Sequence, residues 1–112
     1  MPKQIQIAVA YNPEYAWEPI AVAPDHAFID TRDKLDEVVW SLVSSDPEAE
    51  IQDIVFAEQL FHEVKRDPTN EKNWLGVKPF KNKDGGFKYT IKVGNPKASH
   101  ELDPVLVAGR RP

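Results

Sequence analysis

The sequence predicts an all-β fold, an antiparallel β-sandwich of about seven strands, and three observations support this prediction. Residues 87–93 alternate strictly between apolar and polar side chains, which is the period of a strand with one buried and one solvent-facing side. Residues 38–43 are almost wholly β-branched, aromatic or apolar, which favours a buried strand. Ten prolines are spread along the chain, as is typical of a fold built from short segments.

Length and composition predict one soluble domain spanning residues 1–112. Hydrophobic residues make up 41% of the chain and charged residues 29%, which argues against disorder. No apolar run approaches the roughly 20 residues of a membrane-spanning helix. The N-terminal residues lack the features of a signal peptide, so a cytoplasmic location is expected. The absence of cysteine excludes disulfides and thiolate chemistry.

The first part of the chain predicts three short strands. Residues 3–11 alternate between polar and apolar side chains, and Asn12-Pro13 ends the segment. Residues 18–24 form a short apolar segment between prolines, and strands of this kind usually lie at sheet edges. Residues 26–30 predict another short strand, followed by a polar turn over residues 30–34.

The middle of the chain fits two interpretations. Apolar residues recur there at helix spacing, so the alternative is an α+β fold with central helices over residues 31–44 and 47–66. Trp40 favours the sandwich: on a helix it lies off the apolar face, whereas on a strand it shares one face with Val38 and Leu42.

The next two segments are less regular. A strand over residues 51–56 needs a bulge or register break near Ile51, because only the end of the segment alternates. Residues 58–66 fit a helical turn, and the sandwich prediction allows one short helix in this region.

The C-terminal half contains the clearest turn. Residues 82–86 end in Asp84-Gly85-Gly86 and predict a hairpin-type turn ahead of the alternating strand. Gly94-Asn95-Pro96 ends that strand. A loop then leads to a last strand within residues 102–107.

In this order the segments resemble small bacterial β-sandwich domains of the cupredoxin-like or immunoglobulin-like type. The resemblance covers about residues 18–107 and rests on an apolar strand with a central Trp40, an alternating strand carrying Tyr89, and a last strand opened by Asp103-Pro104. It implies a sandwich of seven or eight strands but no activity, because this architecture has many functions. Copper-binding cupredoxins place a cysteine, two histidines and usually a methionine around the metal. This chain has no cysteine and only the initiator methionine, so the resemblance transfers no copper ligand and no functional residue.

Charge is unevenly distributed along the chain, whose formal net charge is -4. Residues 30–71 carry twelve acids against four bases, whereas residues 72–97 carry seven lysines against one acid. Because aromatic residues are interleaved with these lysines, a basic-face nucleic-acid binder is one functional alternative. The alternation argues against it, because it assigns the rings of Phe87 and Tyr89 to the core.

The three histidines, His26, His62 and His100, define a second alternative, a metal-dependent enzyme or a metal-binding protein. Each has an adjacent acid, but no two histidines lie at a short, ligand-like spacing. The chain also lacks a Gly-x-Ser-x-Gly motif and a phosphate-binding glycine loop. We therefore expect a protein without enzyme activity, with no catalytic residue, no metal and no cofactor.

The leading functional prediction is a non-enzymatic binding or interaction module. Tyr15, Trp17 and Trp74 lie in or beside predicted loops, and exposed loop aromatics can bind a sugar or a partner protein. The long connection over residues 58–73 is the predicted functional loop. The expected partner is a protein or a carbohydrate, and a dimer through an edge strand such as residues 3–11 is a further expectation.

Overall fold

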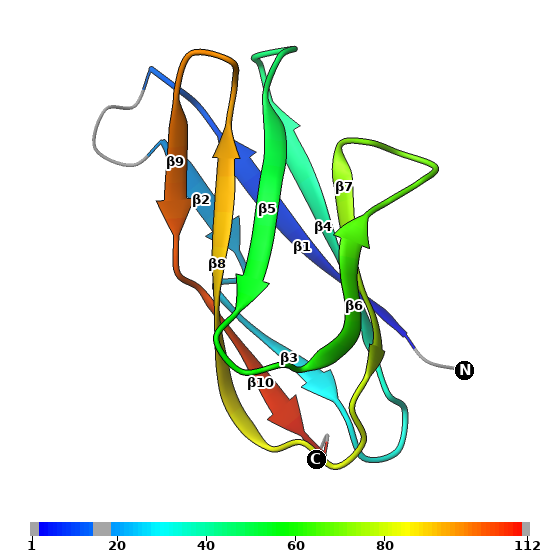
Figure 1. Cartoon of the computed structure of the whole chain (residues 1–112). Coiled ribbons are helices and arrows are strands. Elements are labelled where there is room, and N and C mark those ends of the chain that lie inside the picture. Colours follow the sequence, from blue (N-terminus) through cyan, green and yellow to red (C-terminus); the bar gives the residue numbers. More distant parts are fainter. Residues whose placement is uncertain (1–2, 15–18, 111–112) are drawn as a thin grey trace.

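Ten strands make up the regular structure of residues 3–14 and 19–110, the part of the chain that the computed structural model describes (Figure 1). No helix occurs within these residues. The strands are β1 (Gln4–Tyr11), β2 (Ile20–Ala23), β3 (His26–Asp30), β4 (Glu37–Ser44), β5 (Glu50–Phe56), β6 (Phe61–Arg66), β7 (Asn73–Pro79), β8 (Gly85–Gly94), β9 (Ser99–Leu102) and β10 (Val105–Gly109).

The strands form two packed sheets, as the sandwich prediction requires. The β1 sheet has the order β2-β1-β4-β7-β6, and the β8 sheet has the order β3-β10-β8-β5, with β9 also paired to β8. Two neighbouring pairs, β1 with β4 and β3 with β10, are parallel, and the other pairs are antiparallel. Ten strands replace the expected seven partly because Pro24 and Pro104 interrupt the chain where it leaves β2 and β9.

The prediction of a short helix in residues 58–66 is wrong, and so is the α+β alternative with helices over residues 31–44 and 47–66. These segments contain strands β4, β5 and β6. The apolar residues Leu60, Phe61 and Val64 have a spacing that suits a helix, but pairing with β7 determines the conformation. In β6 the side chain of Phe61 is buried whereas His62 and Glu63 are exposed. Tertiary pairing therefore overrides the local pattern.

Two further expectations about connections are corrected. The turn at residues 82–86 does not join a hairpin, because β7 and β8 belong to different sheets. Gly85 has a φ of 102° at this crossing, a conformation that favours glycine. The strand expected over residues 3–11 is not an edge strand, because β1 lies between β2 and β4.

Other details of the strands are confirmed. A register shift between Ile51 and Asp53 supplies the expected bulge in β5. In β8 the four apolar residues are buried, and Lys88 and Lys92 are exposed on the opposite side. β2 is a short edge strand of the β1 sheet, as the flanking prolines predicted.

The centre of the core is an aromatic cluster in which Trp40 contacts three other rings. Its ring centroid lies 5.5 Å from that of Tyr89, 6.2 Å from that of Phe56 and 6.4 Å from that of Phe61. The indole nitrogen of Trp40 donates a hydrogen bond of 3.1 Å to the hydroxyl of Tyr89. Since β4 and β8 belong to opposite sheets, this bond joins the two layers.

The buried Tyr89 hydroxyl predicts a loss of stability in alkali. Burial raises the pKa of Tyr89 from its ordinary value of 10.0 to about 12, although the hydrogen bond from Trp40 opposes this shift. Between these two pH values the unfolded chain loses the phenolic proton and the folded protein keeps it. We therefore expect this group to lower the free energy of unfolding by about 2–3 kcal/mol as the pH rises from 10 to 12. Denaturant titrations across this range measure the decrease.

The control for this titration is Tyr89→Phe, because lysines also lose protons in the same range. The variant should show a smaller decrease over the same pH interval, by about the amount assigned to Tyr89. Equal decreases in the two proteins would contradict the assignment.

Candidate functional site

The outer faces of the two sheets differ in charge. On the β8 sheet, charged side chains such as Asp53, Lys88 and Lys92 face solvent. On the β1 sheet, the outward side chains contributed by β1, β2, β7 and most of β4 are small or uncharged, and Val43 is 61% exposed. These residues are Gln4, Gln6, Ala8, Ala10, Ala21, Ala23, Val39, Ser41, Val43, Asn73, Leu75 and Val77. We call them the uncharged face.

Strand register brings the members of the uncharged face together in rows. Gln6 lies opposite Val39, and Val39 lies opposite Leu75 across the next pair of strands. Lys65 of β6 lies opposite Leu75 and begins the charged margin of the face. Glu63 forms an ion pair of 3.1 Å with Lys65 along the same strand. Charge is therefore confined to the edge of this surface.

A depression of about 490 Å³ lies on the uncharged face, and we call it the sheet groove. Its apolar lining comes from Val39, Leu75 and Val77. The amide side chains of Gln4, Gln6 and Asn73 supply polar groups around this lining. One wall comes from Lys65 and from the β6–β7 loop at residues 67–69, so this wall carries the two charged residues of the lining, Lys65 and Asp67. Its volume falls within the range of about 300–1,000 Å³ that is usual for ligand-binding clefts.

Hydrogen bonds within the β6–β7 loop hold this wall in one shape. The Asp67 carboxylate accepts bonds of 2.7 Å from the Thr69 hydroxyl and 2.8 Å from the Thr69 main-chain nitrogen. These two bonds lower the pKa of Asp67 below its usual range. The side chain of Asn70 accepts a further bond of 3.1 Å from the main-chain nitrogen of Lys72.

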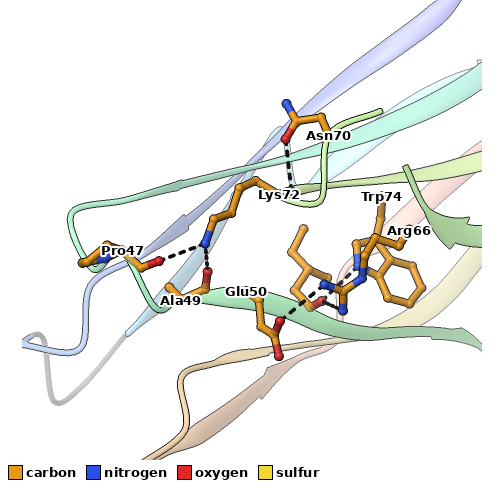
Figure 2. Close-up of polar contacts among 8 residues, drawn as sticks. Pro47, Ala49, Glu50, Arg66, Asn70, Lys72 and Trp74 are labelled. Atoms are coloured by element: carbon orange, nitrogen blue, oxygen red, sulfur yellow. Dashed lines mark hydrogen bonds and ion pairs between the residues drawn. The ribbon is translucent and has the colours of Figure 1, made fainter. Parts of the chain in front are cut away.

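The β6–β7 hairpin is also fastened to the outer edge of β5, as Figure 2 shows. The ammonium group of Lys72 donates to the carbonyl oxygens of Pro47 at 3.1 Å and Ala49 at 2.6 Å. Arg66 and Trp74 both donate to the carbonyl oxygen of Ile51, at 3.3 Å and 2.9 Å. We call Arg66, Lys72 and Trp74 the β5 clamp.

Of the three aromatic residues predicted to contact a partner, only Trp74 lies in the described part of the chain. Trp74 lies within β7 rather than in a loop and is only 9% exposed. The guanidinium carbon of Arg66 lies 5.8 Å from the Trp74 ring centroid, and the indole nitrogen is used in the β5 clamp. Tyr15 and Trp17 lie outside the described residues.

The three histidines lie on three different strands, β3, β6 and β9. His26 lies 3.4 Å from Asp25, His62 stacks on Phe80 with ring centroids 3.9 Å apart, and the ring of His100 lies 6.0 Å from that of Tyr11. Within residues 3–14 and 19–110, no three His, Asp or Glu side chains are grouped as metal ligands. The structure thus does not bring together the residues of the metal-site alternative.

The lysine-rich part of the chain does not combine free rings with lysines along β8. Phe87 and Tyr89 are 4% and 2% exposed and face the core. Lys92 lies opposite Asp53 in the ladder between β5 and β8. Lys72 is used in the β5 clamp. The core therefore encloses the rings of Phe87 and Tyr89, whereas the half-buried ring of Phe80 stacks on His62.

The sheet groove was not predicted from the sequence. One signal was present: the outward positions of β1 are Gln4, Gln6, Ala8 and Ala10, whereas those of β8 include lysines. Nothing in the sequence shows that β1 pairs with β4, which lies more than 30 residues later. The groove depends on that pairing.

Comparison with known proteins adds no relative, because no protein-family model and no curated protein matches the chain. Among the described residues, no helix is long and apolar enough to cross a membrane.

Proposed function

We propose that this protein is a non-enzymatic binding module that holds an extended, uncharged segment of a partner protein in the sheet groove. The observation that carries the proposal is the confinement of charge to the margin of the uncharged face, with a groove of about 490 Å³ near Leu75. Most protein surfaces mix both signs of charge, so an extended uncharged face is typical of a contact surface.

The chemistry of the groove supports a polypeptide ligand. Val39, Leu75 and Val77 offer apolar contact, and the amides of Gln4 and Gln6 can both donate and accept hydrogen bonds. The main-chain amides of an extended peptide need both hydrogen-bond donors and acceptors from the groove. Its apolar side chains need an apolar surface to pack against. A carbohydrate is supported less well, because the groove has no aromatic ring on which a sugar could stack.

The finer fold type is also a proposal. We infer a sandwich of the cupredoxin-like or immunoglobulin-like type without copper ligands. Support comes from the packing of two sheets and from the passage of the chain between sheets at β2 and β3. The position of Trp40 in the core between the two sheets agrees with this assignment.

A library of displayed linear peptides, panned on the purified protein, tests the proposed function. We expect enrichment of uncharged sequences whose binding is lost in Leu75→Lys, because the new charge lies against the apolar lining of the groove. The matched control is Val107→Lys, since Val107 is half-buried like Leu75 and lies on β10 of the other sheet. Fluorescence anisotropy with a labelled, enriched peptide measures affinity for each variant.

Two outcomes would contradict the proposal. One is enrichment only of strongly charged peptides, because the floor of the groove is uncharged and its charged residues, Lys65 and Asp67, lie on one wall. The other is equal loss of binding in Leu75→Lys and Val107→Lys, because that would place the contact elsewhere or indicate general destabilisation. Circular dichroism of both variants shows whether they are folded.

A further inference from the structure

We propose that two copies of this chain associate through the outer edge of β3, at the main-chain groups of His26 and Phe28. This surface is separate from the sheet groove and independent of the proposed function. We call the two residues the β3 window.

The hydrogen-bond pattern of β3 shows which way its main-chain groups point. Val105 donates from its main-chain nitrogen to the Asp25 carbonyl at 3.3 Å, and Thr31 donates to the Gly109 carbonyl at 3.0 Å. In a parallel ladder, alternate residues direct both main-chain groups to the same neighbour. Residues 25, 27, 29 and 31 therefore face β10, and the main-chain groups of His26, Phe28 and Asp30 face away from it.

At the C-terminal end of β3, the outward main-chain groups already have hydrogen-bond partners. Asp30 donates from its main-chain nitrogen to the Asp36 carboxylate at 3.0 Å, and its carbonyl accepts a bond of 2.8 Å from the Asp36 nitrogen. Among the described residues, no hydrogen bond joins the outward main-chain groups of His26 or Phe28 to another residue. The β3 window thus presents two N–H and two C=O groups in strand geometry.

The sheet edges at β5, β6 and β2 are protected. At β5, the β5 clamp occupies the carbonyl of Ile51 and that of Ala49, the residue just before the strand. The Asp53 carboxylate accepts a bond of 2.9 Å from the Ile54 nitrogen. β6 carries exposed charged side chains, and β2 is four residues long between Pro19 and Pro24. Charges, prolines and short strands are the usual protection of sheet edges. The β3 window contains no lysine, arginine or proline.

The occupant that the window fits is the same window on a second copy. Each window offers both donors and acceptors, so two of them related by a two-fold axis run antiparallel and satisfy each other. The side chains of His26 and Phe28 share the outer face of the β8 sheet, opposite Val105 and Val107 of β10. Pairing would bring aromatic side chains of the two copies together on that face. The two β8 sheets would then form one continuous sheet.

His26→Pro tests this pairing with little change to the fold. It removes the outward N–H of residue 26, whereas the donors of β3 to β10 belong to residues 27 and 29. Proline is tolerated at the first residue of an edge strand. Because a symmetric dimer loses this donor twice, we expect self-association to weaken by roughly tenfold or more. His26→Ala keeps the N–H and should weaken it much less.

Sedimentation velocity over a wide concentration range measures self-association, and amide exchange of residues 26 and 28 reports the contact directly. Exchange at these two amides should slow as wild-type concentration rises. Phe28→Lys provides a second disruptive variant if His26→Pro fails to fold. A wild-type protein that stays monomeric throughout would overturn the proposal. So would a dimer that Leu75→Lys abolishes and His26→Pro leaves unchanged, because that dimer would use the uncharged face.

The two proposals can fail separately. Peptide binding in the sheet groove should be equal in wild type and His26→Pro. Self-association should be equal in wild type and Leu75→Lys. Loss of either property alone leaves the other proposal standing.

Discussion

Replacing Trp40 by alanine is expected to lower the free energy of unfolding by about 3–5 kcal/mol, the cost typical of removing a large aromatic side chain from a core. Trp40 is fully buried, and its ring contacts those of Tyr89, Phe56 and Phe61. The change also removes the partner of the Tyr89 hydroxyl. Against a typical stability of about 5–15 kcal/mol, this loss would remove from about a fifth to all of the free energy of unfolding.

Chemical denaturation followed by circular dichroism measures this effect. Val43→Ala is the matched control on the same strand, because Val43 is 61% exposed and should cost no more than about 0.5 kcal/mol. Trp40→Phe keeps an aromatic ring in the core but removes the hydrogen bond. Its loss of unfolding free energy should lie between those of Trp40→Ala and Val43→Ala. A cost below about 1 kcal/mol for Trp40→Ala would show that the ring does not lie at the centre of the core.

Gly94→Ala is expected to destabilise the protein by about 1–3 kcal/mol or more, because a methyl group has no space at this position. A Cβ built there would overlap the carbonyl oxygen of Ala98 and lie 2.7 Å from the Cα of Ser99. Both atoms belong to main chain, so rotation of a side chain cannot relieve the overlap. The β8–β9 turn would have to move, which weakens the 2.9 Å bond from the Asn95 nitrogen to Ala98.

Gly86→Ala is the matched control in the same strand. Its Cβ would approach the Val105 side chain to 3.3 Å, and a side-chain methyl group can shift by a few tenths of an ångström. We expect a change in unfolding free energy within about 1 kcal/mol, of either sign. Equal destabilisation by the two substitutions would contradict the close main-chain approach at Gly94.

Strands with a clear local signal were predictable. The alternation of β8 identified its buried and exposed sides, and the position of Trp40 identified the inner side of β4. The bulge after Ile51 followed from the failure of strict alternation in β5. In each case the signal is the alternation of side chains between neighbouring residues, which can be read directly from the sequence.

The strand β6 was not predictable in the same way. Its region has apolar residues at positions that suit a helix as well as a strand, and the pairing with β7 decides between them. The connection between β7 and β8 at Gly85 could not be predicted from local sequence either. A glycine turn before an alternating strand suits a hairpin, yet here it carries the chain from one sheet to the other.

The sequence by itself determined the all-β class, the inner and outer sides of its regular strands and the absence of cysteine chemistry. Only the tertiary structure decided which strands are neighbours, and both proposed contact surfaces depend on this. The sheet groove exists because β1, β4 and β7 lie side by side, and the β3 window exists because no strand of residues 3–14 and 19–110 pairs with the outer side of β3. The physical reason is that hydrogen bonds between strands are made by main-chain groups, which are the same in nearly every residue. Side-chain order therefore specifies which face of a strand is buried, whereas the packing of the whole chain specifies its partner.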